Sequence, residues 1–475
     1  MPEYSNRTGG YVDPPAAKGA RESLQVIVQG NAAPVLVTGS TGGTDYVENG
    51  TGFGNEDVIL NAKRAFAQQL LELSLDLVEQ IKEDKTEIGN PNGPEYDKRI
   101  FDKLSLKEAT SQLYLEQLKT IGFGLRDKLN PKLFDAFKKR GFMKQQPAEE
   151  PAMAFYTYGQ AQVLWDMMYE ELDPGEDAEW EHFWGFRVPI THWQPGQNRD
   201  HKIQLKRGLF SAVDETLAFA NDEVSLLAQQ LTGGLCHRSL CDEFKNRAQN
   251  ELRRKLNDPA AVEKWFQAQT AKSWFSSFIE KLNEGTKEQD AITLQTIKWK
   301  EKAIRAIFSD PEFTYELIHF ACHCEPDKLS ELLSQLKIHI AGEEISLSVA
   351  LMSVGGEARS DQPGSLVFLN ACGTGEQGQN AEPPGFPENW ISKRGALGVV
   401  ATLCTVPDLF AHAFARKFYK TLFESVANAK APMRERYLAE ALLETRRFFM
   451  TECRNPLGLA YVLYSVRDAC IEPHV

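Results

Sequence analysis

The stretch YELIHFACHC, residues 315–324, is an apolar run that ends in two histidines and two cysteines. Its length and nearly continuous apolar character predict a buried β-strand. Successive side chains of a strand point to opposite faces, so Cys322 and Cys324 share one face while His319 and His323 share the other. These four side chains cannot converge on one ion. We therefore predict neither a metal site nor a cofactor, with His319 in the core and His323 at the polar end of the strand.

A second apolar run, SLVFLNACGTG at residues 365–375, predicts a strand that ends at Cys372 and a glycine-rich turn after it. Neighbouring parallel strands bring their carboxyl ends to one edge of a sheet, where sites form, so we expect His323 and Cys372 to meet. A free thiol has a pKa of about 8.5 and needs a base near neutrality. The imidazole supplies that base, and the backbone N–H of Cys372 can point at the oxyanion of an acyl intermediate.

The rest of the chain predicts an α/β fold in which a mostly parallel sheet is flanked by helices. SLQVIVQ and APVLVTG predict an N-terminal β-hairpin, followed by a glycine-rich loop and then by a helical region. KIQLKRGLFSA predicts one strand, and Asp214 is a plausible cap for the amphipathic helix that follows. We expect three parts: a flexible lead-in with short strands at 1–57, helices at 58–145, and a domain at 153–475 with a helical insertion at about 242–289.

Charge and composition limit the classes of molecule that the chain is expected to bind. The net charge of −13 argues against nucleic acid, because phosphate binding needs a basic surface. No apolar run approaches the ~20 residues of a membrane span, and the N-terminus lacks the features of a signal peptide, so we expect a cytoplasmic protein without membrane contact. The eight cysteines form no CxxC pair, and we expect no disulfides.

The motifs HFACHC and VFLNACGTG resemble the histidine and cysteine motifs of CHAT domains, which are caspase-like cysteine peptidases. Four further segments resemble the same family in the same order, and together the likeness covers about residues 105–465. They are the helical lead-in GFGLRDKLNPKLFDAFKKR, the pair VLWDMMYE and HFWGFRVPI, the segment ISKRGALGVVATLCTVPD, and the closing FARKFYKTLFES, AEALLETRRFF and NPLGLAYVLYS.

The resemblance implies a caspase-like fold and a cysteine endopeptidase, with His323 as general base and Cys372 as nucleophile. It also implies an oxyanion hole made by the backbone N–H groups of Cys372 and Cys324. The family usually has glycine after the histidine; a positive φ there would strain Cys324 by about 1–2 kcal/mol. Four side chains are candidates for the substrate pocket: Asp361, Glu376, Cys404, which stands where the family commonly has tryptophan, and Asp408, which a helix N-cap explains equally.

The family also implies a setting. CHAT peptidases occur in bacterial defence and signalling, some with an activating protein partner and some cleaving a pore-forming protein, so we expect a protein substrate of this kind. Two rival interpretations stay open. In the first, the chain is a catalytically silent scaffold or binding module with the same fold. In the second, it is a redox sensor that uses Cys322, Cys324 and Cys372.

Overall fold

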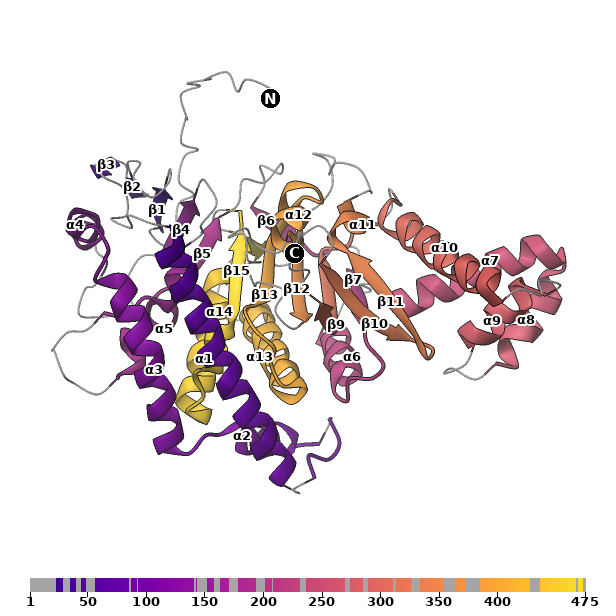
Figure 1. The fold of residues 1–475 in the computed structure, drawn as a ribbon, viewed down its shortest axis with the longest axis horizontal. Coiled ribbons are helices and arrows are strands. Elements are labelled where there is room, and N and C mark those ends of the chain that lie inside the picture. Colours follow the sequence, from indigo (N-terminus) through magenta and orange to yellow (C-terminus); the bar gives the residue numbers. More distant parts are fainter. Residues whose placement is uncertain are drawn as a thin grey trace, which may run out of the picture.

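The centre of the structure is one large β-sheet (Figure 1). In this computed structural model, the described residues are 23–28, 35–39, 44–47, 56–84, 87–91, 93–140, 142, 152–157, 163–170, 178–193, 201–206, 208–230, 236–269, 274–284, 289–310, 313–325, 334–353, 364–371, 385–427, 436–466 and 469–472. The strand order is β11-β10-β9-β12-β13-β15-β5-β4-β1-β2-β3, and β7 pairs with both β8 and β9.

The strands of this sheet are β1 (Ser23–Val28), β2 (Val35–Gly39), β3 (Thr44–Val47), β4 (Ala152–Thr157), β5 (Ile190–Trp193), β7 (Gly208–Val213), β8 (Cys236–Ser239), β9 (Leu317–Glu325), β10 (Gln335–Ile340), β11 (Glu343–Ser348), β12 (Ser365–Ala371), β13 (Ala396–Thr402) and β15 (Tyr461–Ser465). A second, small sheet joins β14 (Arg436–Tyr437), β16 (Cys470–Glu472) and β6 (Lys202–Gln204). In the main sheet, β9, β12 and β13 are parallel neighbours, as are β15, β5, β4 and β1; β13 and β15 run antiparallel.

The helices are α1 (Glu56–Glu83), α2 (Tyr96–Leu104), α3 (Glu108–Arg126), α4 (Pro131–Lys139), α5 (Trp184–Arg187), α6 (Ala220–Gln230), α7 (Leu240–Leu256), α8 (Pro259–Gln267), α9 (Trp274–Leu282), α10 (Gln289–Phe308), α11 (Val349–Ser353), α12 (Phe386–Ser392), α13 (Asp408–Ala427) and α14 (Leu438–Cys453). Short 3-10 helices span Trp165–Met167, Trp180–His182 and Pro456–Ala460.

Helices cover both faces of the sheet around β9. His319 contacts Tyr419 of α13, whereas the ring of the next residue, Phe320, packs against Trp390 of α12. Because neighbouring strand residues point to opposite faces, α13 and α12 lie on opposite sides. Every residue of β12 and β13 is buried, as expected for strands covered on both faces. The predicted α/β fold with a mostly parallel sheet flanked by helices is confirmed.

The N-terminal hairpin and helices pack onto this core. Strand β1 pairs in parallel with β4, so the β1–β2 hairpin extends the main sheet. Helix α2 packs on α13 and α14, where the hydroxyl of Tyr96 lies 3.1 Å from Nε2 of His412. One sheet therefore runs from the N-terminal strands into the domain predicted at 153–475.

Between β8 and β9 the chain forms four helices, α7 to α10, which we call the helical insertion; the range predicted for it, about 242–289, contains α7, α8 and α9 but stops where α10 begins. Figure 1 shows α7, α8 and α9 beyond the β10–β11 hairpin, at one end of the molecule. Aromatic side chains join the four helices: Trp299 of α10 contacts Phe244 of α7 and Phe275 of α9, and Phe266 of α8 contacts Trp274 of α9. The insertion thus has an apolar core of its own.

Three local predictions were wrong. The segment KIQLKRGLFSA forms two strands in different sheets: β6 pairs with β16, and β7 pairs with β8 and β9. Only glycine fits at the start of β7, because Gly208 has a φ of 141° and a Cβ there would lie 1.9 Å from the carbonyl oxygen of Cys236. Asp214 does not cap the following helix, which begins at Ala220. The glycine-rich loop contains strand β3, which pairs with β2.

A buried ion pair joins the segment before β5 to the C-terminal helix. Arg446 of α14 donates from Nη1 to Oδ1 of Asp166 over 2.6 Å, and Nε2 of His192 lies 2.5 Å from Oδ2. Asp166 and Arg446 are each 1% exposed. Burial alone raises the pKa of Asp166, but the charges of Arg446 and His192 outweigh it and lower that pKa to about 2.

Asp166→Asn is therefore expected to lower the free energy of unfolding by about 3–5 kcal/mol near pH 7, because it leaves the Arg446 charge buried without its partner. The pKa of Asp166 is lower in the folded state than its usual 3.8, so its stabilisation is present above that value and is lost as the pH falls toward 2. Urea unfolding at several pH values measures this. The exposed pair of Glu79 and Lys82 is the control, and Glu79→Gln should cost less than about 1 kcal/mol. Equal losses for the two variants would contradict the prediction.

Candidate active site

The carboxyl end of β9 carries His323. Its side chain is exposed, whereas the six residues of β9 before it, Leu317 to Cys322, are all buried. β9 and β12 pair in parallel, and the last described pair joins Ala371 to Cys322. Strand β12 therefore reaches the edge of the sheet beside the residue that precedes His323, and in the sequence the next residue is Cys372.

Three of the predicted site residues lie outside the described residues: Cys372, Asp361 and Glu376. Their predicted roles stay predictions. The described chain ends on both sides of Cys372 at Ala371 and Gly385, and the last peptide group before Cys372 has a defined partner. The hydroxyl of Thr402 at the end of β13 donates to the carbonyl oxygen of Ala371 over 2.5 Å. Thus β13 holds the end of β12 in addition to the strand pairing.

Cys324 belongs to β9, where it pairs with Leu336 of β10. Its side chain is half-buried, and among the described residues only Asn257, Ala341 and Arg454 combine a side chain with a positive φ. The strain considered for a cysteine at this position is therefore absent. A cysteine fits here because the position is part of an ordinary paired strand, which any residue can adopt.

Cys404 and Asp408 lie in the chain just after the carboxyl end of β13. Cys404 is 1% exposed and packs in the core. Asp408 is the first residue of α13, and its carboxylate accepts a hydrogen bond of 3.1 Å from the backbone N–H of Phe219 just before α6. Asp408 thus joins the start of α13 to the start of α6.

The electrostatics of Asp408 connect it to His323. Burial raises the pKa of Asp408, the backbone N–H groups of Phe219 and Ala218 oppose this, Glu223 adds to the rise and His323 lowers it. Charge interactions of this kind act over short distances at protein surfaces. Asp408 is therefore a predicted pocket residue on which His323 acts electrostatically, while Asp361 and Glu376 lie outside the described residues.

A buried polar cluster lies beneath this edge. His319 is 0% exposed; its Nδ1 lies 3.0 Å from the hydroxyl of Tyr419, and its Nε2 lies 2.7 Å from Oε1 of Glu223. Glu223 of α6 also accepts two contacts from the amide of Asn370, at 2.9 and 3.1 Å. Asn370 in turn accepts a hydrogen bond of 2.8 Å from the hydroxyl of Tyr461 on β15. The expectation that His319 is a core residue is confirmed.

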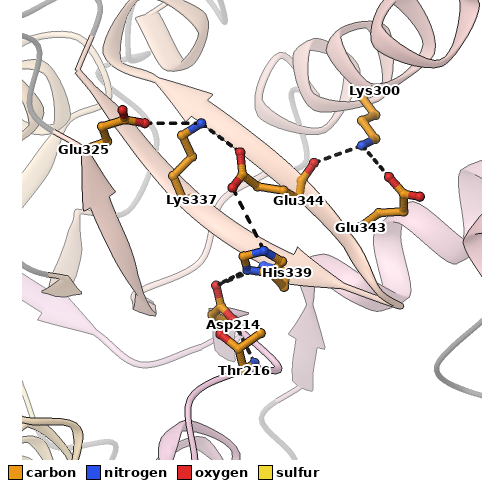
Figure 2. A network of polar contacts seen from close by, with 8 residues as sticks. All are labelled: Asp214, Thr216, Lys300, Glu325, Lys337, His339, Glu343 and Glu344. Atoms are coloured by element: carbon orange, nitrogen blue, oxygen red, sulfur yellow. Dashed lines mark hydrogen bonds and ion pairs between the residues drawn. The ribbon is translucent and has the colours of Figure 1, made fainter. Parts of the chain in front are cut away.

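The β10–β11 hairpin extends the sheet beside His323, since Lys337 of β10 is the register partner of His323. Figure 2 shows the charged groups along this hairpin. Lys337 contacts Glu344 at 2.8 Å and Glu325 at 3.3 Å, and these contacts, led by the one from Glu344, raise the pKa of Lys337. Lys300 of α10 reaches Glu343 at 3.0 Å, so the helical insertion contacts the hairpin.

Asp214 anchors this hairpin to the end of β7 (Figure 2). Its carboxylate accepts from the backbone N–H and hydroxyl of Thr216, and from the backbone N–H and Nδ1 of His339 at 3.0 and 2.9 Å. Burial raises the pKa of Asp214, but the hydrogen bonds outweigh it and keep that pKa below its usual value. A carboxylate with four donors holds β10 firmly beside β9.

Sequence reasoning missed the hairpin, Glu223 and Asn370. The hairpin has a sequence signal, since QLKIHI and EEISLS alternate around a two-residue turn, Ala341 and Gly342, both with positive φ. Asn370 also has one, as the polar side chain inside an apolar strand. Glu223 has none, because an acidic residue on an amphipathic helix is ordinary.

Three whole-chain observations complete the description of the site. Within the described residues, no group of three or more His, Cys, Asp or Glu side chains is arranged to hold a metal ion. The cysteines of this described part form no disulfide with one another. No helix in the same part is both long and apolar enough to cross a membrane.

Comparison with known proteins places the site in a family. The family model described as CHAT domain matches residues 204–456. No curated protein matches the chain by sequence. Among solved structures, the chain is similar to Porphyromonas gingivalis RgpB in a complex of its pro- and mature domains, with 9% identity, a TM-score of 0.32, and coverage of 71% of this chain and 70% of that one.

The chain is also similar to the Saccharomyces cerevisiae separase–securin complex, with 9% identity and a TM-score of 0.39. This match covers 95% of the chain and 30% of the other chain. A third similar structure is the Arg-specific cysteine proteinase gingipain R, with 9% identity, a TM-score of 0.31, and coverage of 71% and 68%.

The contact between Asp408 and Phe219 generates a prediction. Asp408→Ala leaves the N–H of Phe219 without its acceptor and is expected to cost about 1–3 kcal/mol of unfolding free energy, whereas Asp408→Asn retains an acceptor oxygen and should cost less than about 1 kcal/mol. The raised pKa of Asp408 means that the folded protein holds this proton more tightly than the unfolded chain. The wild type should therefore lose stability relative to the Asn variant as the pH rises from about 4. Urea unfolding at steps of about one pH unit between pH 4 and pH 7 measures both effects. Equal stability of the Ala variant and the wild type would contradict the predicted loss of unfolding free energy.

Proposed function

Because the chain belongs to the CHAT domain family, we propose that it is a cysteine endopeptidase in which His323 is the general base and Cys372 the nucleophile. Both residues lie inside the matched range, residues 204–456. The observation that carries the proposal is the pairing of Ala371 with Cys322, which places the last residue of β12 beside the residue of β9 that precedes His323. The exposure of His323 also supports it, because a general base must reach the substrate.

The proposed reaction is acyl transfer to the thiol and then to water. His323 takes the proton of Cys372, and the thiolate forms a C–S bond with the scissile carbonyl carbon. The backbone N–H groups of Cys372 and Cys324 hold the oxyanion. The C–N bond then breaks as His323 returns the proton to the leaving amine, which gives a thioester. His323 next activates a water molecule, which attacks the thioester and releases the acid and the free thiol.

This reaction needs no metal ion and no organic cofactor, because a thiolate, an imidazole and backbone amides supply every group it uses. In the proposed pocket, Asp408 is an acidic residue whose pKa the charge of His323 lowers, and Asp361, Glu376 and Cys404 complete the candidates. A partly buried carboxylate favours a positively charged substrate side chain.

The biological setting is part of the same proposal. The substrate is a selected protein, such as a pore-forming or signalling protein in bacterial defence, and an activating protein partner switches the enzyme on in the cytoplasm. Neither nucleic acid nor membrane binds directly. These assignments rest on the family, and the net charge of −13 is consistent with them.

The dyad predicts a specific thiol reactivity. Iodoacetamide should alkylate Cys372 faster than the other cysteines at neutral pH, and His323→Ala should slow this alkylation about tenfold or more, because the base that forms the thiolate is gone. Mass spectrometry of modified peptides measures each cysteine separately. Cys241 is a matched internal control, since burial raises the pKa of its thiol to about 11 and its alkylation should not depend on His323.

The peptidase activity itself is tested by comparing new protein N-termini in cells that express the wild type with those in cells that express Cys372→Ala. Neo-N-termini present only with the wild type are expected, and their sequences give the substrate and the cleavage preference together. If no such termini occur and alkylation of Cys372 is indifferent to His323→Ala, the chain is a silent scaffold. A mixed disulfide of Cys372 under mild oxidant, without proteolysis under reductant, would instead indicate the redox sensor.

A further inference from the structure

One buried carboxylate touches both strands that lead to the proposed dyad. Glu223 of α6 is 3% exposed, and its Oε1 lies 2.7 Å from Nε2 of His319 on β9. The same carboxylate accepts from the amide of Asn370 on β12, at 2.9 and 3.1 Å. His319 and Asn370 come four and two residues before His323 and Cys372 in the sequence. Glu223 therefore connects the two strands, at the third residue of β9 and at the residue before the last of β12.

His319 and Asn370 each make a second polar contact, away from Glu223. The hydroxyl of Tyr419 on α13 lies 3.0 Å from Nδ1 of His319, and the hydroxyl of Tyr461 on β15 donates to Oδ1 of Asn370 over 2.8 Å. The ring of His319 also stacks on Phe368 of β12, with the two planes 24° apart. Each partner of Glu223 is thus fixed in orientation on both sides, which leaves little freedom for the carboxylate between them.

Packing alone does not require this arrangement. A buried carboxylate costs several kcal/mol to desolvate, and apolar side chains of similar volume commonly hold a core equally well. Hydrogen bonds differ from apolar contacts because their strength depends on direction and distance. The carboxylate of Glu223 accepts such hydrogen bonds from Asn370 on β12, and it lies 2.7 Å from Nε2 of His319 on β9 in a close polar contact without hydrogen-bond geometry. It therefore constrains the relative position of the two strands through one directional contact and one close charge–dipole contact.

We propose that Glu223 is a positioning residue of the peptidase site: by binding His319 and Asn370 it holds the ends of β9 and β12 in the relative position that lets His323 take the proton of Cys372. This inference rests on the proposed function. Glu223 does not touch the substrate and takes no part in bond formation; it acts through the two strands. Displacements of about 1 Å at reacting groups can reduce a rate by about 100-fold, so the effect should appear in catalysis before it appears in folding.

The test uses Glu223→Gln in the full chain. Glutamine retains the volume and one oxygen that can accept from Asn370, but it loses the charge and one of the two acceptors. We expect alkylation of Cys372 by iodoacetamide to slow about 10-fold, and cleavage of the substrate found through its neo-N-terminus to lose kcat by about 10- to 100-fold while KM changes less than about twofold. Asp222→Asn is the matched control: it removes the same charge from the neighbouring position of the same helix and should leave both rates unchanged.

If Glu223→Gln folds poorly, two further variants test the same inference. His319→Gln and Asn370→Ser each remove one of the two partners and leave Glu223 in place. All rates are measured well below the lowest unfolding temperature of the set, so that only folded protein is compared. Slow Cys372 alkylation in each folded variant supports the inference, and a loss confined to KM or to thermal stability overturns it.

The outcomes also separate the inference from the proposed function. If the wild type forms Cys372-dependent neo-N-termini and the folded Glu223→Gln variant matches it in kcat and in alkylation rate, Glu223 has only a structural role and the inference fails alone. If the wild type itself shows no His323-dependent alkylation and no Cys372-dependent cleavage, the proposed function fails and the inference fails with it.

Discussion

The parallel pairing of β9 with β12 is the constraint on which the site depends. It joins Ala371 to Cys322, so both strands end at one edge of the sheet next to His323. The register is strongly specified, because both strands are buried and a slip by one residue would turn every side chain to the other face. Such a slip would place His323 where Cys322 now packs in the core. The proposed chemistry therefore depends on the buried apolar side chains of β9 and β12, because their burial fixes the register that leaves His323 exposed.

Hydrogen bonds from polar side chains fix the strands at this edge of the sheet in addition to the strand pairing. Two of them arrive from other parts of the chain at the end of β12: the hydroxyl of Thr402 binds the carbonyl of Ala371, and the hydroxyl of Tyr461 binds the side chain of Asn370. On the other side of β9, the carboxylate of Asp214 holds β10 through His339. Buried or half-buried polar groups with satisfied hydrogen bonds specify one arrangement of the strands, whereas an apolar contact tolerates several. The edge of the sheet is thus held at β13, β15 and β7.

The helical insertion is connected to this edge. Its helix α10 contacts the β10–β11 hairpin through Lys300, which reaches Glu343 and the backbone carbonyl of Glu344. Glu344 in turn binds Lys337, the register partner of His323. A continuous series of charged contacts therefore runs from the insertion to the strand beside His323 (Figure 2). The insertion also has an apolar core of its own around Trp299.

The sequence by itself determined the fold class, most of the strands, the strand that carries His323 and the strand that ends at Ala371, because apolar runs of strand length are local properties. It did not determine Glu223, Asn370 or the anchoring of the hairpin by Asp214. These depend on contacts between residues far apart in the chain: Glu223 and Asn370 are 147 positions apart, and Asp214 and His339 are 125 apart. Local patterns cannot reveal which buried polar groups meet. Only the packing of α6 against β9 and β12 decided that an ordinary helical glutamate lies beneath the candidate site.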